Sequence, residues 1–289
     1  MRIPESELII NGDGSAFHLH IRPDQLADKV ILVGDPARVA MVKSYFSSVE
    51  ASGASREFVW ATGLYNGVRV TALSTGIGTD NIDIVVTELD ALANVDFKTR
   101  EVNPEHRTLD ILRIGTCGAI QPEIPLGAFI FSHISVGCDG LLNWYEGRDG
   151  IALLDFEEAF KAHVHWDRHL PDPYFVRASD KLTGIFADCT YKGMTISAPG
   201  FYGPQGRVVR QGLAMPDMLR DFETFEFGGY KITNFEMEGS ALAGMAAKLG
   251  HNAGTVCCAI AHRYHKAANT NYKPRVAELI ELSLRKMTE

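Results

Sequence analysis

Short apolar runs rich in β-type residues alternate along this chain with stretches whose apolar residues recur at helical spacing. Several runs are almost continuously apolar, which is typical of strands covered by helices on both faces. The alternation therefore predicts the α/β fold class, with a mixed, mainly parallel sheet flanked by helices. The β-type runs lie at residues 29–34, 108–116, 127–137, 194–201 and 253–261, and the helix-like stretches at 35–46, 81–93, 179–189, 216–227, 239–250 and 275–287.

Three segments depart from this alternation. Residues 58–76 hold two β-rich runs around Asn66–Gly67, a dipeptide that strongly favours a two-residue hairpin turn. We therefore expect one antiparallel hairpin early in the chain. Residues 95–108 and 143–150 are polar and aperiodic, and we predict that both are exposed insertions.

Composition limits the domain count and the partners. The 289 residues are 46% hydrophobic and 22% charged, which is enough apolar content for one large core. No repeat, low-complexity tract or linker interrupts the chain, so we predict a single domain over residues 1–289. The net charge of −8 offers no basic surface for nucleic acid or an anionic membrane. No apolar segment reaches the length of a membrane-spanning helix.

The cysteines indicate a reducing environment. Five of them, at positions 117, 138, 189, 257 and 258, show neither CxxC nor Cys/His metal spacing. The N-terminal residues carry no signal-peptide pattern. We expect reduced thiols, a cytoplasmic location and no metal ligands among these residues.

Arg113 raises the main question about function. It lies inside the apolar run at 108–116, at what the pattern predicts to be the C-terminal edge of a strand. Arginine is rarely buried without an anionic partner. Open α/β sheets bind ligands beyond the carboxyl ends of their strands, so an inorganic oxyanion is one candidate partner. A buried carboxylate of the protein is the alternative.

Glycine-bearing turns at 33–39, 74–81 and 113–118 are predicted to follow three strands. Glycine lets backbone N–H groups approach a ligand closely, and a following helix N-terminus adds positive potential. Arg38 and Arg56 are further candidates for binding the anion, with plain surface exposure as the alternative interpretation.

Taken together, these stretches resemble the nucleoside phosphorylase family, most closely the members that act on uridine. The resemblance covers nearly the whole chain in the same order, and the ordered set is more specific than any single piece. The matching stretches are "AFHLHI", "VILVGDPARV", "SREF", "STGIG", "RIGTCGAIQP", "FYGPQGR", "NFEMEGSAL" and the terminal helix. The resemblance implies phosphorolysis without a cofactor, in which uridine and the co-substrate inorganic phosphate give uracil and ribose 1-phosphate. Tolerance for deoxyuridine and thymidine stays open.

The resemblance also implies roles for individual residues. Those expected to bind phosphate are Gly34, Arg38, Arg56, Arg113 and Thr116. In the family, the residues that match Arg56 and His18 come from the adjacent subunit. We therefore expect a homo-oligomer, at least a dimer, with shared active sites.

The ribose is expected to contact His18, Met237 and Glu238. His18 would meet the 5′-hydroxyl, Met237 would pack against the sugar, and Glu238 would accept hydrogen bonds from the 2′- and 3′-hydroxyls. Glu236 is left unassigned, because acidic residues at a helix start also complement the helix dipole.

The base is assigned to the loop "GFYGPQGR". Uracil presents an acceptor, a donor and an acceptor along one edge, and a glutamine amide with an arginine complements that order. Gln205 and Arg207 have this chemistry, Phe201 can form an apolar wall, and Arg263 is expected near O4. The predicted catalytic residues are Arg113, Gln205 and Arg207. Arg113 would stabilise the charge of phosphate, and Gln205 and Arg207 would stabilise the charge of the departing uracil.

Other functions of the same fold remain as alternatives. Purine-cleaving relatives have an aspartate near the end of the last core strand, where this chain has His262, whose role is open. The missing aspartate argues against a purine substrate. A nucleosidase, a purine nucleoside phosphorylase and a non-catalytic nucleoside-binding protein are kept as alternatives to a uridine-cleaving enzyme. A dinucleotide-dependent oxidoreductase is disfavoured because no GxGxxG follows the first strand. A monovalent cation near Glu57 and residues 76–78 is left open.

Overall fold

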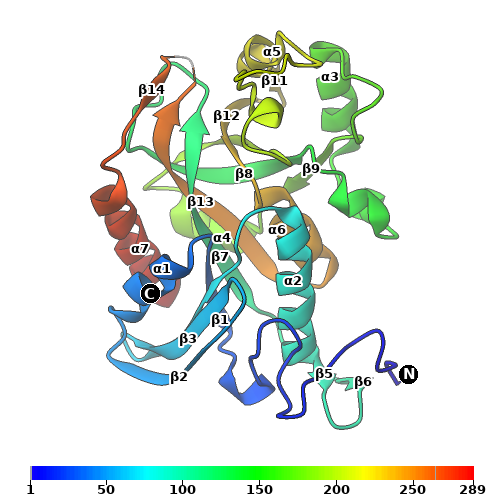
Figure 1. Cartoon of the computed structure of the whole chain (residues 1–289), viewed down its shortest axis with the longest axis vertical. Helices are drawn as coiled ribbons and strands as arrows, with labels where there is room; N and C mark the ends of the chain where they lie inside the picture. Colours follow the sequence, from blue (N-terminus) through cyan, green and yellow to red (C-terminus); the bar gives the residue numbers. More distant parts are fainter. Residues whose placement is uncertain (1, 264) are drawn as a thin grey trace.

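The computed structural model describes residues 2–263 and 265–289, and these residues form a mixed α/β fold (Figure 1). The helices are α1 (Pro36–Lys43), α2 (Thr79–Asn94), α3 (Leu154–Val164), α4 (Asp180–Phe186), α5 (Met218–Thr224), α6 (Gly239–Lys248) and α7 (Lys273–Thr288), with short 3-10 turns η1 (Pro23–Gln25), η2 (Leu141–Trp144), η3 (Arg148–Gly150) and η4 (Gly203–Gln205). The strands are β1 (Lys29–Val33), β2 (Ser48–Ser55), β3 (Phe58–Tyr65), β4 (Val68–Ser74), β5 (Val95–Asp96), β6 (Glu101–Val102), β7 (Asp110–Ala119), β8 (Phe129–Gly137), β9 (Tyr174–Arg177), β10 (Tyr191–Ser197), β11 (Glu226–Phe227), β12 (Tyr230–Glu236), β13 (Asn252–His262) and β14 (Ala267–Ala268).

The main sheet runs in the order β11-β12-β10-β8-β13-β7-β1-β4-β3-β2. The predicted parallel arrangement holds for the central pairs β4–β1–β7–β13 and β8–β10–β12. β12 also pairs antiparallel with β7, and β8 pairs antiparallel with β13. The strands β7, β12, β10, β8 and β13 therefore form a closed ring, which the sequence analysis did not predict.

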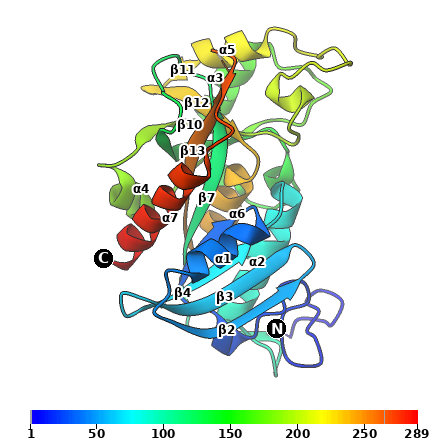
Figure 2. The same ribbon diagram turned by 60° about the vertical axis from the view of Figure 1, so that its left-hand side comes forward.

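Side chains of β1 alternate between the two faces of the sheet. Val30 and Leu32 join a core cluster with α2 and α6, whereas Ile31 and Val33 join a second cluster with α1, α4 and α7. Figure 2 shows α7 beside α4 on this second face. The near-continuous apolar runs are thus explained by helices that cover both faces, as predicted.

Local sequence signals set several boundaries. Asn66 and Gly67 have φ values of 50° and 77° and join β3 to β4 in the predicted antiparallel hairpin. Asp35 caps α1, where its side chain accepts a hydrogen bond from the Ala37 N–H over 2.9 Å, and Pro36 follows in the first turn. Positive φ at an Asn-Gly pair and a fixed φ at proline are properties of the residues themselves, which is why both features could be predicted.

The structure corrects two predictions about boundaries. Residues 113–118 are not a turn, because β7 continues to Ala119 and Arg113 lies well inside it. Gly115 leaves room for the Arg113 side chain, since a Cβ at position 115 would lie 2.4 Å from Nη1 of Arg113. The stretch 95–108 is not wholly exposed: it forms the β5–β6 pair, and buried Arg100 donates to the carbonyl oxygen of Ile3 over 3.0 Å.

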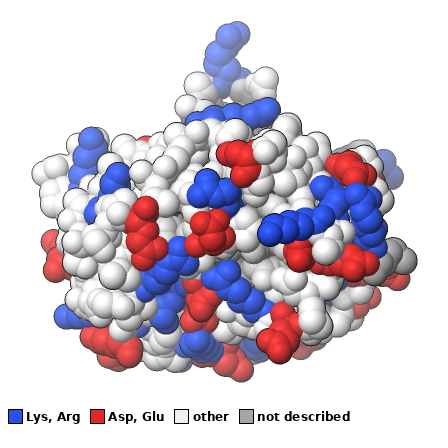
Figure 3. All heavy atoms as spheres, turned by 90° about the horizontal axis from the view of Figure 1, so that it is seen from below, with Lys and Arg blue, Asp and Glu red and all other residues white. Residues whose placement is uncertain are grey.

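Surface charge is mixed on the end of the molecule that carries β2 and β3. Figure 3 shows Lys and Arg side chains interspersed with Asp and Glu on this face. Among the described residues, no helix combines the length and apolarity that crossing a membrane requires.

Candidate active site

A cavity of about 540 Å³ opens where β1, β4, β7, β10, β12 and β13 end or approach their ends. Segments from six parts of the chain meet there, as expected for the carboxyl edge of an α/β sheet. The lining residues are Gly34, Asp35, Pro36, Arg38, Gly76, Ile77, Arg113, Thr116, Cys117, Gly118, Phe201, Gln205, Arg207, Phe235, Glu236, Met237, Glu238, Ile260 and Ala261. Nine residues of the sequence-based assignment are therefore brought together: Gly34, Arg38, Arg113, Thr116, Phe201, Gln205, Arg207, Met237 and Glu238.

One end of the cavity is suited to an anion. Gly34 follows β1, and its backbone oxygen accepts a hydrogen bond from the Gly76 N–H over 3.1 Å, which holds the two glycine loops together. A Cβ on Gly34 would lie 3.4 Å from the Gly76 oxygen, so the loops approach closely. Arg38 in α1 and the Thr116 hydroxyl complete this end, and both residues are half-buried.

Arg113 is met by carboxylates of the protein. Its Nη1 lies 3.0 Å from Oε2 of Glu236, and its Nη2 donates to Oε2 of Glu238. The anion predicted for this buried arginine is therefore, in this structure, a pair of glutamates, which was the alternative interpretation. Of the three arginines predicted to bind phosphate, Arg38 and Arg113 line the cavity, and Arg56, which was expected from a second subunit, does not.

Glu238 lines the cavity and is 3% exposed. Its Oε1 accepts a hydrogen bond from the Gly78 N–H over 2.8 Å, and its Oε2 accepts from Arg113. Burial raises the pKa of Glu238, and the nearby Glu236 adds to the rise, while Arg113 opposes it. The carboxylate is thus fixed on both oxygens beside Met237.

Another part of the cavity wall is formed by the loop around η4. Gln205 is 4% exposed, and its Oε1 accepts a hydrogen bond from Nη1 of Arg207 over 2.7 Å. The Arg207 guanidinium also lies 3.7 Å from the centre of the Phe201 ring. Burial, with Arg263 nearby, lowers the pKa of Arg207 to about 10, so this side chain is charged at neutral pH.

Arg263 lies against the loop that carries Gln205. It is not among the residues that line the cavity, and its Nη2 donates to the backbone oxygen of Gln205 over 3.0 Å. It therefore supports this loop, and its predicted place near O4 of the base stays a prediction. His262 is also outside the lining, and its Nδ1 accepts from the His265 N–H over 3.2 Å. Burial lowers the pKa of His262.

His18 and Arg56 lie outside the cavity of their own chain. The Nδ1 of His18 lies 2.6 Å from Oε1 of Glu88, and Glu88 also accepts from the backbone N–H of Leu19 over 2.9 Å. Arg56 is exposed at the turn between β2 and β3, with φ of 53°. Neither position contradicts a role in the site of another subunit, and that role stays a prediction.

Several lining residues were given no individual role from sequence: Ile77, Cys117, Gly118, Phe235, Ile260 and Ala261. The first three lie in the glycine-bearing segments 74–81 and 113–118, which were expected at the site. All are apolar residues or glycine, and most lie within strands, where sequence offers nothing that separates a cavity wall from a core. Burial raises the pKa of Cys117 well above its usual range, so its thiol stays protonated.

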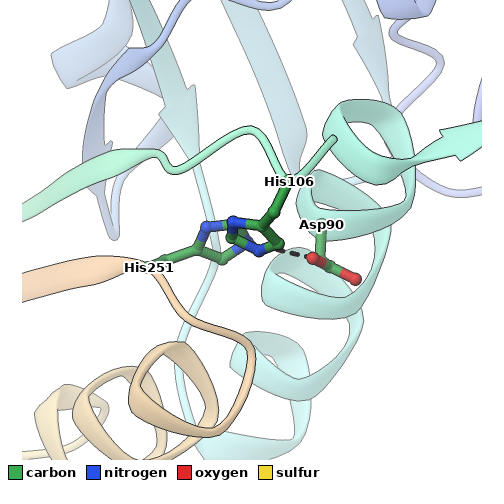
Figure 4. Close-up of side chains that lie close together, drawn as sticks. All are labelled: Asp90, His106 and His251. Atoms are coloured by element: carbon green, nitrogen blue, oxygen red, sulfur yellow. Dashed lines mark hydrogen bonds and ion pairs between the residues drawn. The ribbon is translucent and has the colours of Figure 1, made fainter. Parts of the chain in front are cut away.

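Asp90, His106 and His251 lie together away from the cavity, as Figure 4 shows. Their ligand atoms lie within 4.8 Å of one another, a spacing that raises the question of a metal ion. However, Nδ1 of His251 accepts from the Leu109 N–H over 3.2 Å, so Nε2 carries the proton and points it at Asp90 over 3.1 Å. This buried ring therefore has no free lone pair for a metal, and the cluster joins α2 to the strand β13.

The chain belongs to the phosphorylase superfamily, whose family model matches residues 28–286. Among curated proteins, it is 29% identical to a uridine phosphorylase of Thermococcus kodakarensis over 251 residues, covering 87% of this chain and 79% of that protein. It is 30% identical to a uridine phosphorylase of Haemophilus influenzae, covering 86% of each chain. Among solved structures, a Trypanosoma brucei nucleoside phosphorylase described as showing uridine phosphorylase activity superimposes with a TM-score of 0.87, at 29% identity over 97% of this chain and 99% of that one. These similarities confirm the fold class and the family that the sequence motifs indicated.

Proposed function

We propose that this chain catalyses the phosphorolysis of uridine, giving uracil and ribose 1-phosphate. The observation that carries the proposal is the paired amide and guanidinium of Gln205 and Arg207 in one cavity with Glu238 and the glycine loops. The curated relatives named as uridine phosphorylases support the same substrate. The reaction needs no organic cofactor or metal in this scheme, and inorganic phosphate is the second substrate.

Each wall of the cavity suits one part of the substrates. Gly34, Arg38 and Thr116 offer backbone N–H groups, a guanidinium and a hydroxyl to phosphate. Glu238 accepts hydrogen bonds from the ribose 2′- and 3′-hydroxyls, and Met237 packs against the sugar. In this arrangement the phosphate lies on one face of the ribose and the base on the opposite side.

Gln205 and Arg207 complement uracil in order. The Oε1 of Gln205 accepts from N3–H, its Nε2 donates to O2, and Arg207 donates to O4. As the glycosidic bond lengthens, negative charge develops on uracil, and these donors stabilise it more strongly in the transition state than in the ground state. Positive charge on the ribose is balanced by phosphate, which then bonds to C1′.

Arg113 has a second role besides the phosphate binding that was predicted for it. Its guanidinium compensates the charge of Glu236 and Glu238, and it also lines the cavity next to the phosphate end. We therefore assign it to orienting Glu238 and to adding positive potential there. Arg56 and His18 of a second copy are proposed to complete the phosphate and ribose-5′ ends, which requires at least a dimer.

A purine nucleoside phosphorylase is the second candidate, since a curated Oceanobacillus iheyensis protein of that name is 27% identical to this chain. Residues 252–268 contain no Asp or Glu that could protonate a purine at N7, which favours uridine. An ultraviolet assay of uridine, deoxyuridine, thymidine and inosine, each with and without phosphate, tests the proposal. We expect uracil release that depends on phosphate. Release without phosphate would indicate a nucleosidase, and binding without turnover would indicate a sensor.

A further inference from the structure

A set of hydrogen bonds links Asp139, through Ser240 in the first turn of α6, to the ribose wall of the cavity. It begins at Asp139, which accepts from the hydroxyl of Tyr174 over 3.0 Å and from Oγ of Ser240 over 3.0 Å. The backbone N–H of Ser240 donates to Oγ of Ser197 over 2.8 Å, and Ser197 donates to Oε1 of Glu236.

Glu236 connects these hydrogen bonds to the residues of the cavity wall. Its Oε2 accepts from the Glu238 N–H over 2.9 Å and lies 3.0 Å from Nη1 of Arg113. It also accepts from the Gly239 N–H over 2.9 Å. Glu236 thereby holds both the backbone of Glu238 and the arginine that fixes the Glu238 side chain.

The three hydroxyl-bearing members of the network are fully buried, and Asp139 is half-buried. Tyr174, Ser197 and Ser240 are 0% exposed, so water cannot replace a lost partner. The Tyr174 hydroxyl lies within hydrogen-bond distance of both Asp139 carboxylate oxygens and of Ser240 Oγ, Ser240 donates to Asp139, and Ser197 donates to Glu236. These contacts restrict the orientation of each side chain in the network.

The backbone is also shaped to admit Tyr174. Gly137 pairs with Tyr174 across β8 and β9, and a Cβ at Gly137 would lie 2.1 Å from the tyrosine ring. The absence of a side chain at the end of β8 therefore allows the ring to reach Asp139, two residues further on.

We propose that Asp139, Tyr174, Ser240 and Ser197 are positioning residues that act through Glu236 to fix the Glu238 carboxylate for the ribose 2′- and 3′-hydroxyls. The inference rests on the proposed function for the identity of the sugar. None of the four lines the cavity, so their effect is exerted only through Glu236. Loss of the Ser197 hydroxyl leaves the buried Ser240 N–H without its acceptor and removes a donor from Glu236, and loss of the Tyr174 hydroxyl removes a donor from Asp139.

The test measures discrimination between uridine and 2′-deoxyuridine, which lacks one hydroxyl that Glu238 is expected to bind. Dissociation constants of both nucleosides are measured by calorimetry for the wild type, Tyr174→Phe and Ser197→Ala. Tyr145→Phe is the matched control, because the Tyr145 hydroxyl donates to Asp83, outside the network. Thermal melting of each variant establishes that it is folded.

We expect Tyr174→Phe to reduce the preference for uridine by roughly threefold and Ser197→Ala by about tenfold, since Ser197 contacts Glu236 directly. Tyr145→Phe should keep the wild-type preference. If Tyr174→Phe fails to fold, Ser197→Ala decides the matter. Folded variants with an unchanged preference would overturn the inference, as would a wild type that does not distinguish the two nucleosides. Normal discrimination without phosphate-dependent uracil release would instead overturn the proposed reaction and leave the positioning role supported.

Discussion

Arg207 donates from Nη1 to Oε1 of Gln205 over 2.7 Å, and this contact fixes which way the glutamine amide points. A guanidinium can only donate hydrogen bonds, so the atom that faces it must be the amide oxygen. The Nε2 group of Gln205 is then turned to the other side. The wall therefore presents donor, acceptor and donor in a row, the complement of the uracil edge.

This relationship predicts a large effect of Arg207→Ala. The variant loses the donor for O4 and frees the Gln205 amide to rotate, so kcat/KM for uridine should fall by about 10² to 10³. Steady-state release of uracil measures the change. Arg210→Ala, at a neighbouring exposed arginine, is the control and should stay close to wild type. Near wild-type turnover by Arg207→Ala would remove this residue from the mechanism.

The positions of Arg56 and Arg207 predict complementation between subunits. If Arg56 acts in the site of a second copy, Arg56→Ala and Arg207→Ala disable the same site from different chains. Mixing the two inactive variants during refolding or co-expression should then restore activity to about a quarter of wild type in a dimer, because half the dimers are mixed and each has one intact site. A mixture no more active than its components would place Arg56 outside the shared site.

Asp110 predicts a stability effect that depends on pH. Its carboxylate accepts from Nζ of Lys181 over 2.6 Å and from Nδ2 of Asn252 over 2.9 Å. Burial acts to raise the pKa of Asp110, but these partners hold it below the ordinary value. A carboxylate whose pKa is lowered in the folded protein adds to stability at pH values above its ordinary pKa. That contribution is lost as the pH falls through the lowered pKa.

Asp110→Asn should therefore lower Tm by a few degrees at neutral pH, with the difference shrinking as the pH falls below about 3.8. Thermal melts of both proteins over a pH series provide the measurement. Asp24→Asn is the control, since the Asp24 side chain is 72% exposed. A difference in Tm between wild type and Asp110→Asn that stays constant to the acid limit of the fold would contradict the argument.

Two glycines predict opposite effects of the same substitution. Gly137→Ala forces a Cβ into the Tyr174 ring and should destabilise the fold by about 1–3 kcal/mol or more. Gly184 lies within α4, where a Cβ meets nothing within 4 Å, so Gly184→Ala should stabilise by about 0.5–1 kcal/mol. Urea denaturation of each variant gives the two free energies of unfolding. Equal effects of the two substitutions would mean that Tyr174 moves aside freely.

Part of the site follows from sequence because its residues lie in short continuous motifs. Gln205 and Arg207 are two positions apart in one loop, and Met237 and Glu238 are adjacent at the start of α6. The missed lining residues, such as Ile260 and Ala261, have no such pattern, because an apolar side chain at a strand end looks the same in a core and in a cavity. The contact between Arg263 and the Gln205 backbone was not predicted for a related reason: the neighbours of Arg263 in sequence do not show which way its side chain turns.

The sequence by itself determined the α/β class, the Asn66–Gly67 hairpin and the start of α1, since these depend on backbone preferences and on periodicity within a few residues. Only the tertiary structure decided that β12 closes on β7 and that Arg113 is held by Glu236 and Glu238. Both depend on segments more than one hundred residues apart in the chain, and the side-chain partners across such a distance are set by how the whole sheet packs. The arginine in an apolar run predicted an anionic partner, and the fold determined that Glu236 and Glu238 are the carboxylates that meet it.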